Sequence, residues 1–210
     1  MIGFEDFSLF MWNVRGATSA NAKLALKEYI RRHKPDIIVL VETHCQFQRT
    51  QRFWKAQGFL PGCIVEATGH SGGIWVLCHQ SSPFKVMPLE SFHQAVTFDV
   101  VLGAFSWTCS AIYASPTPNL REELWGHLAQ LRSTVVKPWM VVGDFNEILY
   151  PLEVRGGAFL ASRALRFADA LEACHLIDLG VKGGSFTWHR KERGTLKVSK
   201  RLDRAVADHE

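Results

Sequence analysis

The sequence predicts an α/β protein, a layered sandwich of strands and helices that forms a single domain over residues 1–210. Short apolar runs bounded by turn residues recur along the chain, which is the pattern of buried strands. Runs with apolar residues at helical spacing lie between them. The 210 residues are 47% hydrophobic and 21% charged, which suits one sizeable core.

The first half of the chain alternates strand and helix signals before it becomes β-rich. Residues 8–13 are expected to form a strand, and residues 21–32 a helix that Thr18 or Ser19 caps. Pro35 marks the end of that helix, and a strand is expected over 37–41. From about 59 to 113 the pattern is β. Its clearest strand-like runs are 74–78, 95–102 and 105–113.

The second half contains two helix signals, a strand and a hairpin. A helix opens at Pro118, and a strand ends at Asp144. A second helix is expected over 162–174. Its apolar face is expected to consist of Leu165, Ala168, Leu171 and Cys174. Residues 185–204 are expected to form a hairpin that turns near Arg193 and Gly194.

Charge and hydropathy exclude some classes of protein. The net charge of +4 only weakly favours an anionic partner. No apolar stretch is long enough to cross a membrane, and Glu5 and Asp6 near the N-terminus do not fit a signal peptide. These features predict an intracellular protein, nuclear or cytoplasmic, without a membrane partner.

The cysteines agree with this assignment. They are Cys45, Cys63, Cys78, Cys109 and Cys174. Their number is odd and none forms a CxxC pair, which is typical of reduced, mostly buried thiols. His44 and Cys45 are adjacent, but without a second pair of ligands they do not predict a zinc site.

Polar residues lie at the ends of several apolar runs. They are Asn13, Glu42, Tyr113, Asp144 and, two residues later, Asn146. If these strand ends lie side by side, their carboxylate and amide oxygens form a cluster that suits Mg²⁺. Each residue also has a simpler interpretation. Asp144 and Asn146 can form a turn, Glu42 can be a solvated strand end, and Asn13 and Tyr113 can be a cap and a rim aromatic.

An ordered set of short strings distinguishes these interpretations. The strings are WNVRG, PDIIVLVET, SGGIWVL, VVGDFNEIL, LEACHLIDLG, GSFTW and KRLDRAVAD. Together they resemble the endonuclease/exonuclease/phosphatase superfamily, which includes deoxyribonuclease I, AP endonucleases and inositol-phosphate 5-phosphatases. The nearest resemblance is to the AP-type endonuclease domain of plant LINE-type (non-LTR) retrotransposons. It implies a deoxyribonuclease I-like, four-layer fold, with a two-sheet β-sandwich flanked by helices.

The resemblance also implies a role for each site residue. Glu42 matches the main Mg²⁺ ligand, for which Mn²⁺ can substitute, with Asn13 and Asp144 close to the metal. Tyr113 and Asn146 match groups that contact the phosphate, and Asp144 also matches the group that orients or deprotonates the attacking water. Asp203 matches an aspartate that orients a catalytic histidine. Attack on a phosphodiester needs a positioned water, a cation on the non-bridging oxygens and donors for the developing charge.

The expected hairpin has a basic, aromatic composition. The residues expected to bind DNA are Trp188, Arg190, Lys191, Arg193, Lys197 and Arg201. By alternation along one strand, Lys197, Ser199, Arg201 and Asp203 should share a face. A solvated basic edge strand that prevents aggregation is the alternative. The resemblance favours DNA binding, since the matching hairpin of the family lies near DNA.

The catalytic histidine of the family belongs to a Ser-Asp-His string near the C-terminus, which this chain lacks. Asp203 and His209 are six residues apart, about 20 Å along a strand. His209 is therefore expected to be an exposed tail residue, and the fold to lack its final strand.

The implied function is a Mg²⁺-dependent phosphodiesterase, a DNA-nicking endonuclease of a retrotransposon with impaired activity. Intact relatives are fused to a reverse transcriptase, and the oligomeric state stays open. The alternatives are a phosphatase or phosphodiesterase acting on a small phosphorylated substrate, and a non-catalytic DNA-binding remnant.

Overall fold

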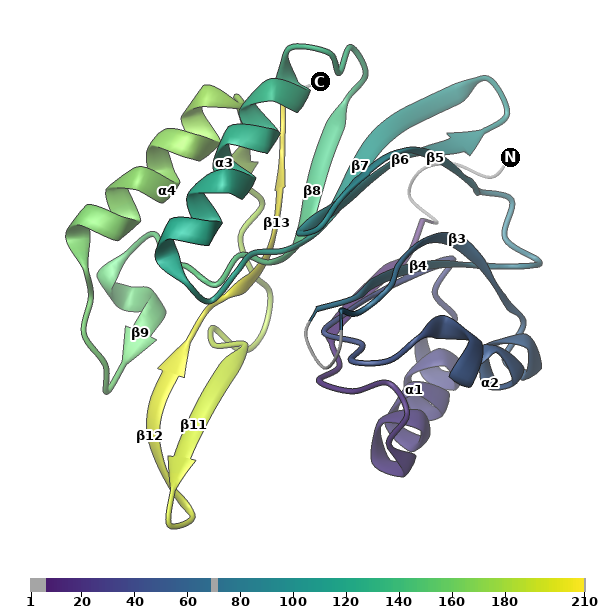
Figure 1. The fold of residues 1–210 in the computed structure, drawn as a ribbon, viewed down its shortest axis with the longest axis horizontal. Helices are drawn as coiled ribbons and strands as arrows, with labels where there is room; N and C mark the ends of the chain where they lie inside the picture. Colours follow the sequence, from purple (N-terminus) through teal and green to yellow (C-terminus); the bar gives the residue numbers. More distant parts are fainter. Residues whose placement is uncertain (1–6, 69–71, 210) are drawn as a thin grey trace. The chain divides into compact units, whose positions relative to one another are not determined.

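The computed structural model describes residues 7–68 and 72–209 (Figure 1). Contacts between residues divide the chain into two compact units, one ending at Tyr113 and the other beginning at Ala114. Each unit contains strands and helices. None of the helices in the described part of the chain is long and apolar enough to cross a membrane.

The first unit contains a four-stranded mixed sheet with the order β1-β2-β4-β3. Its strands are β1 (Leu9–Asn13), β2 (Ile37–Val41), β3 (Phe59–Val65) and β4 (Ile74–His79). β1 and β2 are parallel, whereas β4 is antiparallel to both β2 and β3. All five residues of β2 are buried, as expected for a continuous apolar run in the middle of a sheet.

Two helices cover one face of this sheet. They are α1 (Ala20–His33) and α2 (Gln51–Ala56), with the short 3₁₀ helix η2 (Phe47–Arg49) before α2 (Figure 1). The Ser19 hydroxyl caps α1 by accepting a hydrogen bond from the Ala22 amide, which confirms one of the two expected caps. Leu26 of α1 and Trp54 of α2 pack in one core with Leu40 and Trp75 of the sheet.

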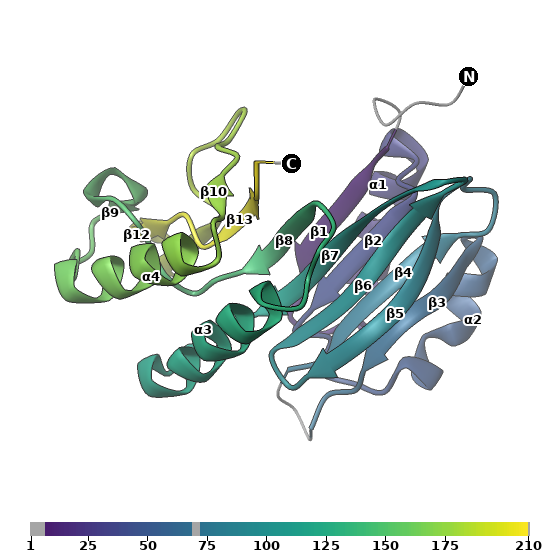
Figure 2. The same cartoon turned by 90° about the horizontal axis from the view of Figure 1, so that it is seen from above.

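Three antiparallel strands lie against the other side of the sheet. They are β5 (Lys85–Phe92), β6 (Ala95–Leu102) and β7 (Phe105–Tyr113), which run side by side in Figure 2. β2 and β4 contact β7, and β3 contacts β5 and β6, so the first unit is a two-layer β-sandwich. The expected ranges of β6 and β7 match the structure at both ends.

The second unit is built on β8 (Trp139–Asp144), β13 (Asp203–Ala207) and the two-residue β10 (Ile177–Asp178). β13 pairs antiparallel with both β8 and β10. The helices α3 (Pro118–Arg132) and α4 (Ala161–Ala173) contact each other and run side by side in Figure 1. The rings of Trp125, Phe145 and Phe167 pack against one another in the core of this unit.

The apolar face predicted for α4 is partly wrong. Leu165 is 62% exposed, and the buried residues of the helix are Ala164, Phe167 and Leu171. The predicted and the observed buried residues both have helical spacing. The packing of Phe167 against Trp125 of α3 and Phe145 after β8 decides which face of the helix is buried. Cys174, at the end of the helix, is buried as expected.

A small three-stranded sheet contains the expected hairpin. β11 (Trp188–Glu192) pairs with β12 (Thr195–Lys200), which also pairs with β9 (Val154–Arg155) after the 3₁₀ helix η3 (Pro151–Glu153). Arg193 and Gly194 form the turn, both with positive φ (49° and 79°), as a type I′ hairpin turn requires. The expected turn position is confirmed.

Candidate functional site

The pairing of β1 with β2 brings Asn13 and Glu42 together. The two strands are parallel and in register, with Asn13 opposite Val41, so both end at the same edge of the sheet. The Asn13 side-chain amide donates a hydrogen bond to Glu42 Oε1 at 3.1 Å. Both residues are half-buried at this edge. Two of the predicted site residues therefore form a direct contact within the first unit.

The backbone at Glu42 has an uncommon conformation. Glu42 and His44 both have positive φ (53° and 54°), which costs free energy for residues other than glycine. Thr43 between them is fully buried. A β-carbon on Gly73 would lie 2.1 Å from Thr43 Oγ1, so the close approach of these two segments requires glycine at position 73.

The donor atoms around Glu42 fit a hard divalent cation. A half-buried carboxylate and a neighbouring amide supply oxygen atoms, and Mg²⁺ is usually held by one or two carboxylates together with water and substrate phosphate. Among residues 7–68 and 72–209, no group of three or more His, Cys, Asp and Glu side chains is placed to hold a metal ion. One carboxylate and one amide suit a cation that keeps open positions for water and substrate.

The second unit brings Asp144, Asn146 and Asp203 together. Asp144 ends β8, and in the antiparallel pairing it lies opposite Asp203 at the start of β13. Asn146 has a positive φ of 49°, and its backbone amide donates to Asp144 Oδ1 at 2.8 Å. Its side-chain amide donates to the carbonyl of Ala114 at 2.8 Å, and the Ala114 amide donates to the Asp144 carbonyl. The Asp-Phe-Asn turn is thus fixed to the segment that follows Tyr113.

Tyr113 is the last residue of β7. It is half-buried, and its backbone amide donates to the Gln94 carbonyl at 2.9 Å. The predicted site residues therefore occur as a pair in the first unit, a trio in the second, and Tyr113 where the first unit ends. Their convergence into a single site stays a prediction.

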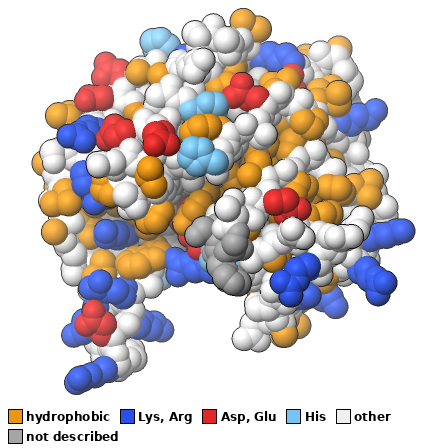
Figure 3. All heavy atoms as spheres, viewed as in Figure 1, with side chains coloured by type: hydrophobic (Ala, Val, Ile, Leu, Met, Phe, Trp, Pro, Cys, Tyr) orange, Lys and Arg blue, Asp and Glu red, His pale blue; other side chains and the backbone are white. Residues whose placement is uncertain are grey.

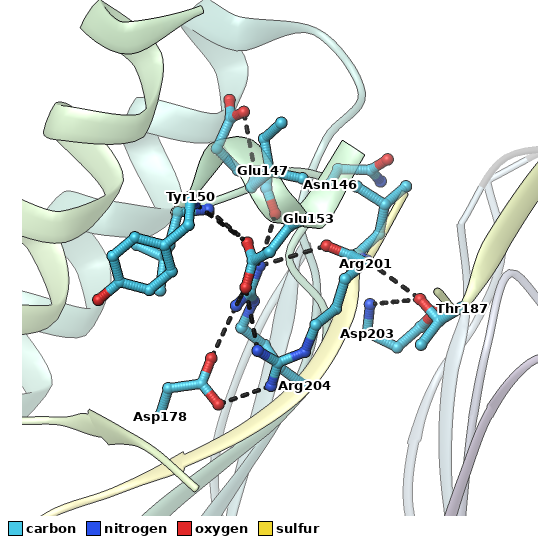
Figure 4. A network of polar contacts seen from close by, with 12 residues as sticks. Asn146, Glu147, Tyr150, Glu153, Asp178, Thr187, Arg201, Asp203 and Arg204 are labelled. Carbon is cyan, nitrogen blue, oxygen red and sulfur yellow. Dashed lines mark hydrogen bonds and ion pairs between the residues drawn. The ribbon is translucent and has the colours of Figure 1, made fainter. Parts of the chain in front are cut away.

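A buried ion network surrounds the strand that contains Asp203 (Figure 4). The guanidinium groups of Arg201 and Arg204 both donate to Glu153 and to Asp178, at 2.6–3.0 Å. Glu153 also accepts a hydrogen bond from the Leu149 backbone amide. The two arginines flank Leu202 and Asp203, whose backbone amides both donate to Thr187 Oγ1 at 3.0 Å. The start of β13 is therefore held on both sides.

The ionisation of these groups follows from burial and pairing. Burial opposes the charged form of Glu153, but the bonds and charges of Arg204 and Arg201 outweigh it and lower the pKa of the carboxyl. The pKa of Asp178 is lowered for the same reasons. Burial also opposes the charge on Arg204, and the two carboxylates raise its pKa in spite of it. Glu153, Asp178 and Arg204 are therefore charged at neutral pH.

A second buried cluster supports the loop after β8. Arg121 and Arg163 both donate to Glu147 Oε2 at 2.8 Å, and Arg121 also donates to the Ser115 carbonyl. Burial lowers the pKa of the Arg121 guanidinium, which the charge of Glu147 opposes. Glu147 directly follows Asn146, so this cluster anchors the Asp-Phe-Asn turn to α3 and α4.

The hairpin presents most of its basic residues to solvent. Arg190, Lys191, Arg193 and Lys197 are exposed, whereas Trp188 is half-buried. Figure 3 shows lysine and arginine side chains gathered on this projecting segment. Its shape and charge are compatible with the predicted contact to a phosphate backbone.

The prediction for Arg201 is corrected by the structure. β12 ends at Lys200 and β13 begins at Asp203, so the alternation expected from Lys197 to Asp203 is broken. Ser199 and Arg201 are buried, and the Arg201 guanidinium is engaged by Glu153 and Asp178. Arg201 therefore stabilises the fold at this position instead of facing solvent.

Several polar partners of these groups were not identified from the sequence. Glu153 and Asp178 are among them. The RxxR spacing of Arg201 and Arg204 indicates that acidic partners are needed, but not which residues supply them. The contact of His44 with Glu42 was also not identified; His44 Nε2 lies 3.6 Å from Glu42 Oε2. The available signal for this contact was that His44 follows Glu42 by two residues, directly after a buried strand. The expected exposure of His209 is confirmed.

Solved structures with a similar fold include two endonucleases and a 3′ phosphatase. The endonuclease domain of TRAS1, a telomere-specific non-LTR retrotransposon, matches with a TM-score of 0.72 at 15% identity, over 97% of this chain and 85% of that one. The AP endonuclease LMAP from Leishmania major has a TM-score of 0.74 at 14% identity, covering 97% and 79%. The 3′ phosphatase NExo from Neisseria, bound to a product DNA hairpin, has a TM-score of 0.74 at 15% identity, covering 97% and 87%.

These matches confirm the expected fold class, an α/β protein with two mixed sheets flanked by helices. No curated protein sequence matches this chain. The model of the endonuclease/exonuclease/phosphatase family matches residues 12–209, nearly the whole sequence. The chain therefore belongs to the endonuclease/exonuclease/phosphatase family.

Proposed function

We propose that this protein is a Mg²⁺-dependent phosphodiesterase that nicks DNA, of the type found in non-LTR retrotransposons. The observation that carries the proposal is the direct contact of Asn13 with Glu42 at the edge of a buried sheet, in a chain of this family. The fold of a retrotransposon endonuclease domain supports the finer assignment, as do the ordered sequence strings. A nuclear or cytoplasmic location and fusion to a reverse transcriptase in relatives are part of the proposal.

Each half of the proposed site has a distinct task. In this proposal Glu42 and Asn13 of the first unit, together with Asp144 of the second, would hold a Mg²⁺ or Mn²⁺ ion. The bound cation supplies charge stabilisation on the non-bridging phosphate oxygens. Asp144 accepts a hydrogen bond from the attacking water, and Asn146 and Tyr113 donate hydrogen bonds to the phosphate. Asp203 is the carboxylate that would orient a catalytic histidine, and the Ser-Asp-His string that supplies this histidine in the family has no counterpart in the sequence.

The exposed basic residues of the β11–β12 hairpin bind the DNA backbone in this proposal. Replacing Arg190, Lys191, Arg193 and Lys197 with Gln should weaken binding to duplexes of any sequence. The salt slope of log Kobs should fall in magnitude by about 0.9 for each phosphate that the variant no longer neutralises. Fluorescence anisotropy at salt concentrations from about 50 to about 200 mM measures both effects. An unchanged slope would show that the hairpin is only a solvated edge.

A plasmid assay tests the enzymatic proposal. The full chain should nick supercoiled DNA in the presence of Mg²⁺ or Mn²⁺, and addition of a chelator should stop the reaction. Glu42→Ala should lower the rate by at least about 10²-fold, since an electrostatic centre of the reaction is removed. Glu28→Ala is the matched control, because Glu28 is an exposed carboxylate on α1 that forms an ion pair with Arg31. Nicking in chelator, or full activity of Glu42→Ala, would contradict the proposal.

Hydrolysis of a small phosphorylated substrate is the second candidate, supported by the fold match to the 3′ phosphatase NExo. An inositol-phosphate assay run beside the plasmid assay separates the two. Phosphate release without DNA nicking would favour the small substrate. Salt-dependent DNA binding without either reaction would favour a non-catalytic DNA-binding protein.

A further inference from the structure

His44 lies beside Oε2 of the Glu42 carboxylate, whereas Oε1 accepts the hydrogen bond from Asn13. The distance from His44 Nε2 to Glu42 Oε2 is 3.6 Å. The side chain of His44 is 32% exposed and that of Glu42 is 16% exposed. The carboxylate thus has an amide at one oxygen and an imidazole at the other, and solvent reaches both side chains.

The backbone holds this arrangement rigidly. The amides of Gly16 and Ala17 donate to the carbonyls of Glu42 and Thr43 at 2.8 and 3.0 Å. The amides of Thr43 and His44 donate to the carbonyls of Gly73 and Gly72. These backbone hydrogen bonds fix a turn in which two residues other than glycine have positive φ. Backbone strain of this kind persists where the surrounding structure determines it, often at functional sites.

The chemistry of the side chains suggests which ligand they share. Two ligands at about 2.1 Å from one cation are separated by at most about 4.2 Å, which includes the observed 3.6 Å. Mg²⁺ is held by oxygen donors, and an imidazole nitrogen binds first-row transition metals better than it binds Mg²⁺. This affinity rises from Mn²⁺, which also accepts oxygen donors, to the later metals. A nitrogen donor at this position would therefore change which cation the site prefers.

We propose that His44 is a nitrogen ligand to the cation held by Glu42, and that it shifts the preference of the site from Mg²⁺ towards Mn²⁺. The inference rests on the proposed function, because it assigns a further ligand to the same cation. Asn13, Glu42 and His44 then form the protein part of the first unit's metal site. Water and substrate phosphate complete the coordination.

Metal binding by the full chain without DNA tests the inference. Mn²⁺ binding is measured by electron paramagnetic resonance, and Mg²⁺ by competition. His44→Asn is the informative variant, because asparagine tolerates positive φ and offers an oxygen in place of nitrogen. His175→Asn is the matched control, since His175 is an exposed histidine with a φ of 56° at the end of α4.

The expected result is selective. His44→Asn should weaken Mn²⁺ binding on the order of 10-fold, while Mg²⁺ binding changes little. Electron spin-echo spectroscopy of the Mn²⁺ complex should show a ¹⁴N coupling in the wild type that disappears in His44→Asn and remains in His175→Asn. Glu42→Gln should weaken the binding of both cations.

Two results would overturn the inference, in different ways. In the first, cation binding depends on Glu42, but His44→Asn leaves it unchanged, or weakens it equally for both cations and keeps the ¹⁴N signal. This result rules out His44 as a ligand and leaves the proposed function intact. Absence of Glu42-dependent binding of either cation overturns the inference together with the proposed metal site.

Discussion

Glu42 in the first unit and Asp203 in the second are held in place by different forces. Around Glu42 the contacts are backbone hydrogen bonds, which fix a turn with two positive-φ residues. Around Asp203 they are buried ion pairs, in which Arg201 and Arg204 bind Glu153 and Asp178. The first arrangement costs backbone strain, while the second depends on the ionisation of buried carboxylates.

The two regions are therefore vulnerable to different changes. The turn at Glu42 depends on small residues such as Gly73 that allow two segments to approach closely. The start of β13 depends on charge balance, since Arg204 is buried and is satisfied largely by two carboxylates. Mutations should affect stability through strain in the first unit and through unpaired charge in the second.

Removal of Glu153 from the ion network should be the most destabilising change. Glu153→Ala should lower the free energy of unfolding by roughly 3–5 kcal/mol, because it leaves the buried Arg204 with a single carboxylate partner in the network. Urea unfolding at neutral pH measures the change. Glu172→Ala, on the exposed side of α4, is the control and should change stability by less than about 0.5 kcal/mol. An effect as small as that of the control would show that the network contributes little.

Acid should weaken the second unit through the same network. The pKa values of Glu153 and Asp178 are lowered in the folded state, from about 4.3 and 3.9 when unfolded. Because the unfolded chain then binds more protons, the stability that these groups contribute is complete well above about pH 4 and declines as pH falls through that range towards the folded pKa values. Urea midpoints at neutral pH and at several points down to about pH 3.5 follow the decline.

Glu153→Gln should reduce this pH dependence, because one of the titrating groups is removed. Its urea midpoint should be lower than that of the wild type at neutral pH and should approach it at the acid end of the series. Parallel curves for the two proteins would contradict the role of Glu153.

The strained turn at Glu42 should give a more modest difference. Glu42→Gly should be more stable than Glu42→Ala by about 1 kcal/mol, since both lack the carboxylate and only glycine adopts positive φ without strain. Urea unfolding of the two variants measures the difference directly. Equal stability would show that the turn stores no strain at position 42.

Much of the fold was predictable from local sequence signals. The range of β2 follows from an unbroken apolar run, and the start of α1 from the cap at Ser19. The buried face of α4 was not predictable, because Leu165 and Phe167 both lie on faces with helical spacing. The stacking of Phe167 on Trp125 selects between them, and that contact joins residues far apart in the sequence.

The candidate site was predictable only in part, for the same reason. Asn13 and Asp144 could be predicted because they lie at the ends of apolar strands. The register of the strand pairs then places Asn13 opposite Val41, next to Glu42, and Asp144 opposite Asp203. The burial of Arg201 follows from no local pattern, since its partners Glu153 and Asp178 come from η3 and β10. Contacts of this kind require the three-dimensional fold.

A double-mutant cycle on plasmid nicking in Mg²⁺ tests whether the two units contribute to one active site. If Glu42 of the first unit and Asp144 of the second serve one reaction, Glu42→Ala and Asp144→Ala should each lower the single-turnover rate by at least about 10²-fold. The double variant should then be hardly slower than the worse single variant, because the two residues act as a unit. Full activity of either single variant, or rate reductions that multiply in the double variant, would contradict a shared site.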